Sequence, residues 1–462
     1  MSDRRLPLVL SPLVLAVALV GLAPTLPAIG AVPVGVVGRE ISTSVDRSRV
    51  VSLPITASHV AVHWRDAPDA NVSLAFSADG ATFSGPEAVE HDDHGTAHGD
   101  RVFGGVIWAP GVRFVRVTSD RPVGDLRIVA IDAHAPTKST APASEHTVAA
   151  AVEQPAVISR AGWAANESLR FDQSGNELWP PEFYPTQKLT VHHTAGKNAD
   201  PDPAATVRAI YYYDAVTKDW GDMGYNFLID ESGRIYEGRY SRAYDATEIP
   251  SGEDLNGYGV TGAHVGGYNA GTVGIALLGT LTNQDATAAA RAALERLLAW
   301  KAERSSIDPL GEGLYTNPVS GAQKTNANIS GHRDWAATEC PGGNFYATFP
   351  SLRQAVAARI SGTEPPAATV PGAPILTAKP PTTGKGVKLN WTAPADGGSG
   401  ITAYNVLQVN NGSFVNIATV SGATLSYRDG TTKRGRTYTY VGRAVNAIGP
   451  GPYSNESSAV AR

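Results

Sequence analysis

Between residues 36 and 132, hydrophobic and polar residues alternate in short runs that turn-forming residues separate. In residues 59–64, for example, Val60, Val62 and Trp64 fall on one face of an extended chain. A period of two residues is typical of strands with one buried face, and several such strands in succession favour a sandwich. We therefore predict an N-terminal β-sandwich-like domain over residues 36–132, with strands at residues 59–64, 71–77, 111–118 and 125–132.

The pattern changes between residues 157 and 361, where strand-like runs are mixed with helical periods. Asp202 is a suitable N-cap for a helix, and Pro203 suits its first turn. Strands interspersed with helices predict a central α/β domain, a mixed sheet flanked by helices, over residues 157–361. The predicted strands are residues 188–193, 226–230 and 272–278, and the predicted helices are residues 203–219 and 286–304.

Residues 371–462 return to the alternating pattern of a β domain. This segment resembles a fibronectin type III module, because Trp391 lies in an early strand, Tyr404 begins the next, and residues 436–440 lead into residues 446–451. The resemblance implies a β-sandwich, although such a fold does not by itself define a function. The predicted strands are residues 387–391, 403–409, 415–420 and 437–444, and residues 133–156 and 362–370 are predicted linkers.

The first 30 residues have the features of an export signal. Arg4 and Arg5 precede an apolar run over residues 6–22, and small residues follow near Ala28. This order is typical of a cleaved secretory signal peptide; a retained membrane anchor is the alternative. Arginine outnumbers lysine and alanine is abundant, which fits a GC-rich bacterial genome. We expect a bacterial protein that is secreted or held in the cell wall, with no membrane segment after cleavage.

Charge and cysteine content exclude several classes of function. The 38 basic and 43 acidic residues give a net charge of −5, and no sustained basic stripe is present, which argues against nucleic acid as the partner. The single cysteine, Cys340, excludes a framework of internal disulfides. It is therefore a buried inert thiol, a nucleophile or a metal ligand.

Histidines near Cys340 raise the possibility of a metal site. His332 precedes the cysteine by eight positions, and His192 and His193 end a predicted strand. Catalytic zinc commonly takes three protein ligands and leaves one position open. Two alternatives remain at this point: Cys340 as a nucleophile with His332 as its base, or structural histidines bound by hydrogen bonds. Neighbouring strand residues face opposite ways, so His192 and His193 cannot both point at one ion, and parity alone does not choose between them.

The central domain resembles the zinc-dependent N-acetylmuramoyl-L-alanine amidases related to peptidoglycan recognition proteins. The matching motifs include His-His-Thr-Ala-Gly at residues 192–196, Gly-His-Arg-Asp at residues 331–334 and Thr-Glu-Cys-Pro-Gly at residues 338–342. They occur in the order of the family. The other matching motifs are residues 158–163, 222–229, 233–239, 262–264 and 273–279.

The resemblance implies an amidase site and its cofactor, Zn²⁺. It implies that His192, His332 and Cys340 hold the zinc, and that the phenol of Tyr225 reaches toward the scissile carbonyl. Thr338 stands where some relatives carry a lysine, and we include it among the catalytic candidates. We expect substrate contacts from the side chains of Trp220, His264 and His193.

The expected reaction is hydrolysis of the bond between the lactyl group of N-acetylmuramic acid and the L-alanine of peptidoglycan stem peptides. A non-catalytic peptidoglycan-binding protein is the alternative, although the zinc cysteine is usually missing from such relatives. Distant amidases carry a glutamate in the strand that corresponds to residues 273–279, and this chain has none there. The identity of the general base is therefore left open. The sequence also leaves open the type of stem peptide, the role of the N-terminal domain and the oligomeric state.

Three local features complete the expectations. Residues 241–256 and 313–326 are predicted loops that could line the groove. Tyr211, Tyr212 and Tyr213 are consecutive on a predicted helix, so at least one of them should be exposed. The cluster His91, Asp92, Asp93 and His94, with His98, is interpreted as a solvated turn rather than a metal site.

Overall fold

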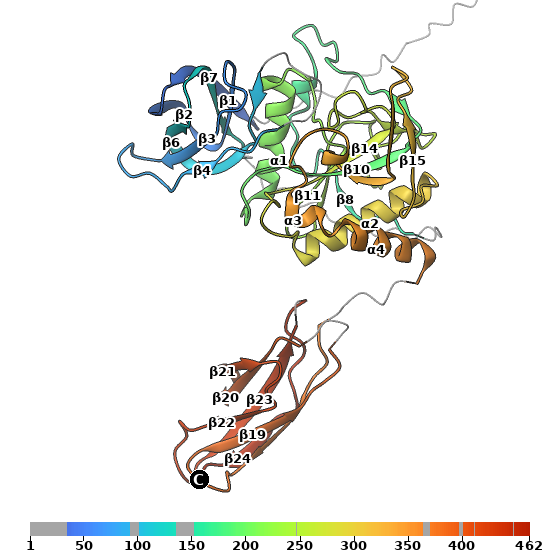
Figure 1. Cartoon of the computed structure of the whole chain (residues 1–462). Helices are drawn as coiled ribbons and strands as arrows, with labels where there is room; N and C mark the ends of the chain where they lie inside the picture. The colour runs from blue at the N-terminus through green and yellow to red at the C-terminus, as the bar shows by residue number, and fades with distance from the viewer. Residues whose placement is uncertain are drawn as a thin grey trace, which may run out of the picture. The chain divides into compact units, whose positions relative to one another are not determined.

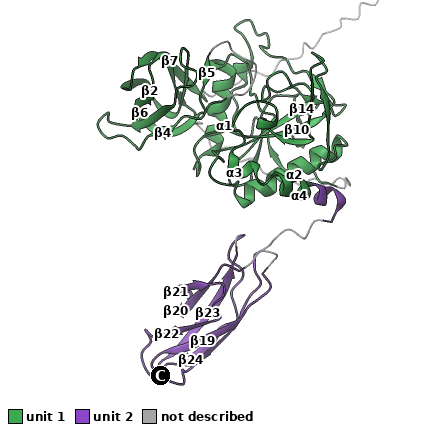
Figure 2. Cartoon of the chain, in the orientation of Figure 1, with its two compact units in different colours: residues 1–356 green, residues 357–462 purple. Residues whose placement is uncertain are grey.

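The computed structural model describes residues 35–92, 101–134, 152–245, 247–363, 370–396, 401–410, 412–446 and 448–462. The chain forms two compact units, residues 1–356 and residues 357–462 (Figure 1 and Figure 2). The predicted signal peptide and most of both predicted linkers lie outside the described residues. Within the described ranges, no helix combines the length and the apolar character that crossing a membrane requires.

The N-terminal strands form one antiparallel sheet, and the sandwich-like packing expected for this domain stays a prediction. The order is β1-β7-β2-β6-β3-β4, and β5 pairs with β2. The long strand β2 joins the two halves of the sheet, because its first part pairs with β6 and its last part with β7. Alternation predicts strands, but it does not predict which strands share hydrogen bonds. The strands are β1 (Val37–Val45), β2 (Ser48–Trp64), β3 (Val72–Ser77), β4 (Glu87–Ala88), β5 (Val102–Phe103), β6 (Ile107–Ser119) and β7 (Val123–Asp132).

Both faces of the last part of strand β7, from Ile128 to Ile131, are buried against different partners. Leu126, Ile128 and Ala130 pack into the core of the N-terminal sheet. The alternate residues Val129 and Ile131 belong to a second cluster, which contains helix α1 (Pro203–Tyr212) of the α/β domain. Since successive strand residues point to opposite faces, one strand serves both cores.

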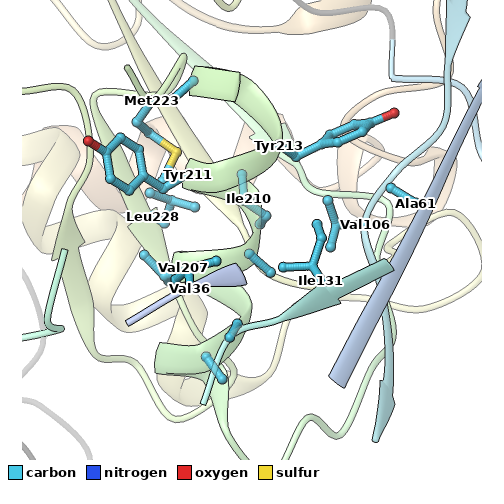
Figure 3. Packing of buried hydrophobic residues seen from close by; sticks show 14 of the residues in the cluster. Val36, Ala61, Val106, Ile131, Val207, Ile210, Tyr211, Tyr213, Met223 and Leu228 are labelled. Carbon is cyan, nitrogen blue, oxygen red and sulfur yellow. The ribbon is translucent and has the colours of Figure 1, made fainter. Parts of the chain in front are cut away.

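We call this second cluster the joint core. Figure 3 shows Val106 and Ile131 of the N-terminal region beside Ile210 of α1. The N-terminal region and the α/β domain are therefore joined by apolar packing within one compact unit. The N-terminal members of the joint core are Val36, Ala61, Phe103, Val106, Val129, Ile131 and Ala133, and its buried α1 members are Ala205, Val207, Ala209, Ile210 and Tyr211.

A six-stranded mixed sheet lies at the centre of the α/β domain, in the order β17-β10-β14-β11-β12-β8. The first four strands are parallel neighbours, and β12 runs antiparallel to β11. This confirms the predicted mixed sheet with helices. The sheet strands are β8 (Val157–Ile158), β10 (Lys188–His193), β11 (Phe227–Ile229), β12 (Ile235–Glu237), β14 (Thr272–Leu277) and β17 (Ile329–Gly331).

Two short pairs of strands lie outside the main sheet. β9 (Phe183–Tyr184) pairs with β13 (Gly259–Val260). β15 (Glu312–Thr316) and β16 (Gln323–Ala327) form a hairpin where the sequence predicted a loop. The remaining helices are α2 (Ala288–Arg304), α3 (Gly343–Tyr346), α4 (Phe349–Ser361) and the 3-10 helices η1 (Glu167–Arg170) and η3 (His332–Asp334).

Helix α1 begins as the sequence predicts and ends differently. The side chain of Asp202 accepts a hydrogen bond from the backbone N–H of Ala205, and Pro203 occupies the first turn. After Tyr212 the helix widens into a π-helical turn, η2 (Tyr213–Thr217). π-Helical turns are rare in proteins, and those that occur are often found at functional sites.

None of the three consecutive tyrosines is exposed, contrary to the prediction. Tyr211 and Tyr213 are fully buried, and Tyr212 is half-buried with its ring against the backbone of Gly38 in β1. The N-terminal region covers the side of α1 that the sequence of the helix alone assigns to solvent.

The C-terminal unit has two antiparallel sheets and a hydrophobic core of its own. The sheets have the orders β18-β19-β22 and β21-β20-β23-β24. Trp391, Tyr404 and Tyr440 are among the buried residues between them. The resemblance to fibronectin type III stays a prediction. The strands are β18 (Ile375–Lys379), β19 (Val387–Thr392), β20 (Ala403–Asn410), β21 (Ser413–Ser421), β22 (Ser426–Asp429), β23 (Thr437–Val445) and β24 (Ser457–Val460).

Candidate functional site

Two adjacent parallel strands bring His192 and His332 together. His192 lies near the end of β10, and His332 begins η3 directly after β17. Strands β10 and β17 pair with Val191 opposite Gly331, so the next residue of each strand is a histidine. The two imidazole centroids are 4.9 Å apart. The register of the sheet therefore sets this pair.

Cys340 completes a three-residue cluster with these histidines. Its Sγ lies 3.7 Å from Nδ1 of His192, and one possible ligand atom from each of the three residues lies within 4.8 Å of the others. Adjacent sulfur and nitrogen ligands of a tetrahedral zinc ion are about 3.6 Å apart, given ordinary bond lengths. The spacing and the donor types fit zinc. All three residues are buried.

The ring of His192 is oriented by His264. Nε2 of His192 lies 3.1 Å from Nδ1 of His264, whose Nε2 lies 3.2 Å from the hydroxyl of Thr272. That hydroxyl donates to the backbone carbonyls of Tyr268 and Asn269, so its oxygen accepts a hydrogen bond from Nε2–H of His264. His264 therefore accepts the Nε2–H of His192, and Nδ1 of His192 is left with a lone pair facing Cys340.

Backbone and side-chain contacts also hold Cys340. The backbone N–H of His193 donates to its Sγ at 3.4 Å, an interaction that favours the thiolate form. The hydroxyl of Thr338 accepts from the backbone N–H of Cys340 at 3.2 Å. The N–H of Arg333 donates to the carbonyl of Cys340, which ties the two ligand-bearing segments together.

The side chain of His193 points away from the cluster and toward the N-terminal region. Its Nδ1 accepts a hydrogen bond from the backbone N–H of Leu281, so a neutral ring carries its proton on Nε2. That Nε2 lies 3.4 Å from Oε2 of Glu90, and the other carboxylate oxygen, Oε1, accepts from the hydroxyl of Thr282. Burial raises the pKa of Glu90 above its ordinary value.

Tyr225 lies beside the cluster in the turn before β11. Its ring stands edge-on to that of His192, with centroids 5.5 Å apart. Its carbonyl accepts from the backbone N–H of Arg239, and the neighbouring Asn226 side chain bridges to Gly274 and Val260. Burial, assisted by the charge of Asp92, raises the pKa of Tyr225 well above its ordinary value. The phenol is therefore a protonated donor at neutral pH.

Trp220 lies close to Tyr225 and is half-buried. A Cβ atom added to Gly224 would stand 2.7 Å from its ring, so the indole packs directly on that glycine. The ammonium of Lys218 is 4.4 Å from the centre of the Trp220 ring. Asp219 is exposed, with a positive φ of 57°.

Comparisons with known proteins identify the family to which the central domain is related. A sequence profile described as N-acetylmuramoyl-L-alanine amidase matches residues 182–343. The chain is 30% identical over 194 residues to peptidoglycan recognition protein 1 of Bos taurus, covering 41% of this chain and 80% of the relative. It is 29% identical over 198 residues to peptidoglycan-recognition protein SC2 of Drosophila melanogaster, covering 41% and 82%. The chain belongs to the peptidoglycan recognition protein family.

Solved structures of the family are also similar to this chain. That of Drosophila PGRP-LB is 26% identical and covers 42% of this chain and 92% of its own, with a TM-score of 0.30. The profile match contains His192, Tyr225, His332 and Cys340. It does not contain the N-terminal region.

Sequence reasoning missed the acidic residues that the N-terminal region brings to the site. Glu90 contacts His193, and Asp92 contacts Lys218 at 2.6 Å. Asp92 belongs to the cluster interpreted as a solvated turn, yet its described contact is with the α/β domain; Asp93, His94 and His98 of that cluster lie outside the described residues. No spacing within the sequence signals a contact between segments more than 100 residues apart.

Proposed function

We propose that this protein is a zinc-dependent N-acetylmuramoyl-L-alanine amidase of peptidoglycan. The proposal is carried by the cluster of His192, His332 and Cys340, a soft mixed set of nitrogen and sulfur donors with the spacing of a tetrahedral site. Three ligands leave a fourth position for reaction, as catalytic zinc sites do. The bond to be cut joins the lactyl group of N-acetylmuramic acid to L-alanine.

The chain's own residues supply orientation and a proton donor. A zinc ion held by the three ligands supplies a Lewis acid and an activated water at neutral pH. Tyr225 donates a hydrogen bond to the oxygen that becomes negative as the amide is attacked. His264 is fully buried, so we assign it the task of holding the ring of His192 in place of the predicted substrate contact. Thr338 holds the turn at Cys340.

We propose peptidoglycan stem peptides as the substrate, and Trp220 as one of the residues that contact them. In the family, a Gly-Trp pair before the tyrosine motif accompanies a preference for meso-diaminopimelate; here the pair is Asp219-Trp220. The exposed Asp219 carboxylate adds a charge that attracts the free amine of either diaminopimelate or lysine. His193 is buried beside Glu90, and we propose that it shapes the floor of the site. The site of action is the cell wall outside the cytoplasm.

Two variants test this function together. Cys340→Ser removes the softest ligand, so zinc content and activity should both be lost. Tyr225→Phe keeps the ring and removes only the phenol, so zinc should stay at about one ion per chain while kcat falls about 10²-fold, as for a lost oxyanion donor. Metal content is measured by atomic absorption, and products of purified peptidoglycan are identified by mass spectrometry.

The expected products are intact stem peptides and unbroken glycan strands. Zinc-loaded protein that binds peptidoglycan and releases nothing would replace the amidase with a recognition protein. Products cut within the glycan, or between amino acids of the stem, would contradict the proposed bond.

A further inference from the structure

A chain of polar contacts leads from the N-terminal region to the candidate tyrosine. Oδ2 of Asp92 lies 2.6 Å from Nζ of Lys218, and the same ammonium lies 2.9 Å from Oδ1 of Asp214. The other oxygen of Asp214 accepts from the backbone N–H of Gly224 at 3.0 Å. Gly224 immediately precedes Tyr225. Three contacts therefore link the carboxylate of Asp92 to the backbone of Gly224, the residue before Tyr225.

The same ammonium also supports Trp220. Lys218 is buried, and it faces the ring of Trp220, which in turn rests on Gly224. Although burial by itself lowers the pKa of Lys218, Asp214 and Asp92 raise it above its ordinary value, so the ammonium stays charged. A charged, desolvated ammonium over an indole face is attractive. Lys218 therefore holds Trp220 as long as its own position is fixed.

Local backbone geometry places Lys218 at this point. It follows directly after the π-helical turn η2, and its N–H donates to the carbonyl of Tyr213. The backbone N–H of Trp220 donates to the carbonyl of Asp214. The widened turn therefore brings the side chains of Asp214, Lys218 and Trp220 close together.

Asp92 is held by the N-terminal sheet and not by the α/β domain alone. Its backbone N–H donates to the carbonyl of Phe103, and the carbonyl of Glu90 accepts from the N–H of Gly105. Phe103 is itself a member of the joint core, with its ring edge-on to Tyr213 at 6.1 Å. The N-terminal sheet thus holds the backbone of Asp92, whose carboxylate contacts Lys218.

We propose that Asp92 is a positioning residue of the candidate active site, contributed by the N-terminal β region, and that it acts through Lys218 to hold Trp220 for binding of the stem peptide. The inference rests on the proposed function and adds a task for a region outside the family match. Neutralising Asp92 leaves Lys218 paired with Asp214, so the fold keeps a balanced ion pair. Lys218 then has one anchor in place of two.

The expected effect is on substrate binding. Asp92→Asn should raise KM for a soluble N-acetylmuramyl tripeptide about tenfold with little change in kcat, the pattern of lost binding energy. It should weaken binding of an analogue with a reduced lactyl–alanine amide by the same factor. Zinc content and melting temperature should match the wild type.

A double-variant cycle shows whether Asp92 acts through Trp220. Trp220→Ala should raise KM at least as much, and adding Asp92→Asn should then have no further effect, since coupled residues are not additive. Glu87→Gln is the matched control: it lies on the same segment and pairs with Lys197 at 3.5 Å on the surface. It should leave KM and kcat unchanged.

Three results would overturn the inference: a wild-type KM for Asp92→Asn, a wild-type KM for Trp220→Ala, or additive losses in the double variant. In each, an active wild-type enzyme leaves the proposed function standing. A wild-type protein that neither binds nor cleaves the tripeptide would instead remove the proposed function, and this inference with it.

Discussion

The two β regions of this chain have similar sequence patterns and different relations to the rest of the protein. The C-terminal region is a separate compact unit with a core of its own around Trp391 and Tyr440. The N-terminal region has its own core around Trp64, but it also contributes a second face to the joint core with α1. The C-terminal β region is thus a separate unit, and the N-terminal β region belongs to the same compact unit as the candidate site.

The difference lies in what covers the second face of the sheet. In the last part of β7, from Ile128 to Ile131, both sets of alternate residues are apolar and buried. In β18 and β19 the alternate residues Lys379 and Lys388 face solvent. A strand that is apolar on both faces needs two partners. A β region of this kind depends on a second domain for burial of its second face, which alternation of hydrophobic and polar residues does not reveal.

Removing each β region in turn gives the largest expected effect. Without residues 1–151, the joint core would expose Val207, Ile210 and Tyr213. Each large apolar side chain contributes about 1.5–3 kcal/mol on burial, and a domain is stable by only about 5–15 kcal/mol. We expect insoluble or unfolded protein without zinc. Removing residues 370–462 should leave zinc content and the melting temperature of the first unit unchanged.

Soluble expression, zinc content and circular dichroism melting compare the two truncations. A folded, zinc-binding protein that begins at residue 152 would contradict the joint core as a requirement for the fold. A loss of zinc in the C-terminal truncation would contradict the independence of the second unit.

Much of the central domain could be predicted because local pattern decides it. Strand β10 begins and ends at the predicted residues, and Asp202 caps α1 as expected. The π-helical turn after Tyr212 was missed, because the predicted helix ran on regularly to residue 219. The hairpin β15–β16 was missed as well. Its strands alternate weakly and are half exposed, so neither hydrophobic period stands out.

The site divides in the same way between local and long-range information. His192, His332 and Cys340 could be proposed because the motifs around them resemble those of zinc amidases; the donor types alone left the choice between His192 and His193 open. The approach of His192 and His332 follows from the register of two strands. Glu90, Asp92 and Lys218 are common surface residues in sequence, and only the packing of the N-terminal region on α1 gives them a role. The expected substrate contact of His264 stays a prediction; its full burial and its contact with His192 were not foreseen.

A matched pair of core substitutions tests the two regions separately. Ile131→Ala opens a cavity in the joint core, and Leu389→Ala opens one in the C-terminal core; both side chains are fully buried. Each should lower the free energy of unfolding by about 2–5 kcal/mol. Calorimetry should show two transitions, with Ile131→Ala lowering the one that zinc stabilises and Leu389→Ala lowering only the other. If either variant shifted both transitions, the two units would not unfold independently.

The smallest expected effect is a pH dependence that only the first unit should have. His59 in β2 reaches across the joint, with Nε2 2.8 Å from the hydroxyl of Thr206 in α1. Burial, together with the charges of His134 and Arg208, lowers the pKa of His59 to about 3. The neutral ring is therefore the folded form. The C-terminal region, residues 371–462, contains no histidine.

The sign of the effect follows from the lowered pKa. A histidine that is harder to protonate when folded contributes stability above its ordinary pKa near 6.5, and this is lost as the pH falls toward 3. Between pH 7.5 and pH 5 the loss should be about 2 kcal/mol in the first unit. His59→Gln can still donate to Thr206 and cannot titrate, so its first transition should fall less over this range. Zinc-loaded samples of both proteins are compared by calorimetry. The contributions of the other titratable groups cancel in this comparison, because both proteins contain them. If the first transition of both proteins changed equally with pH, His59 would be accessible to protons and the joint core would open readily. If the C-terminal transition changed with pH to the same extent, the two units would not be independent.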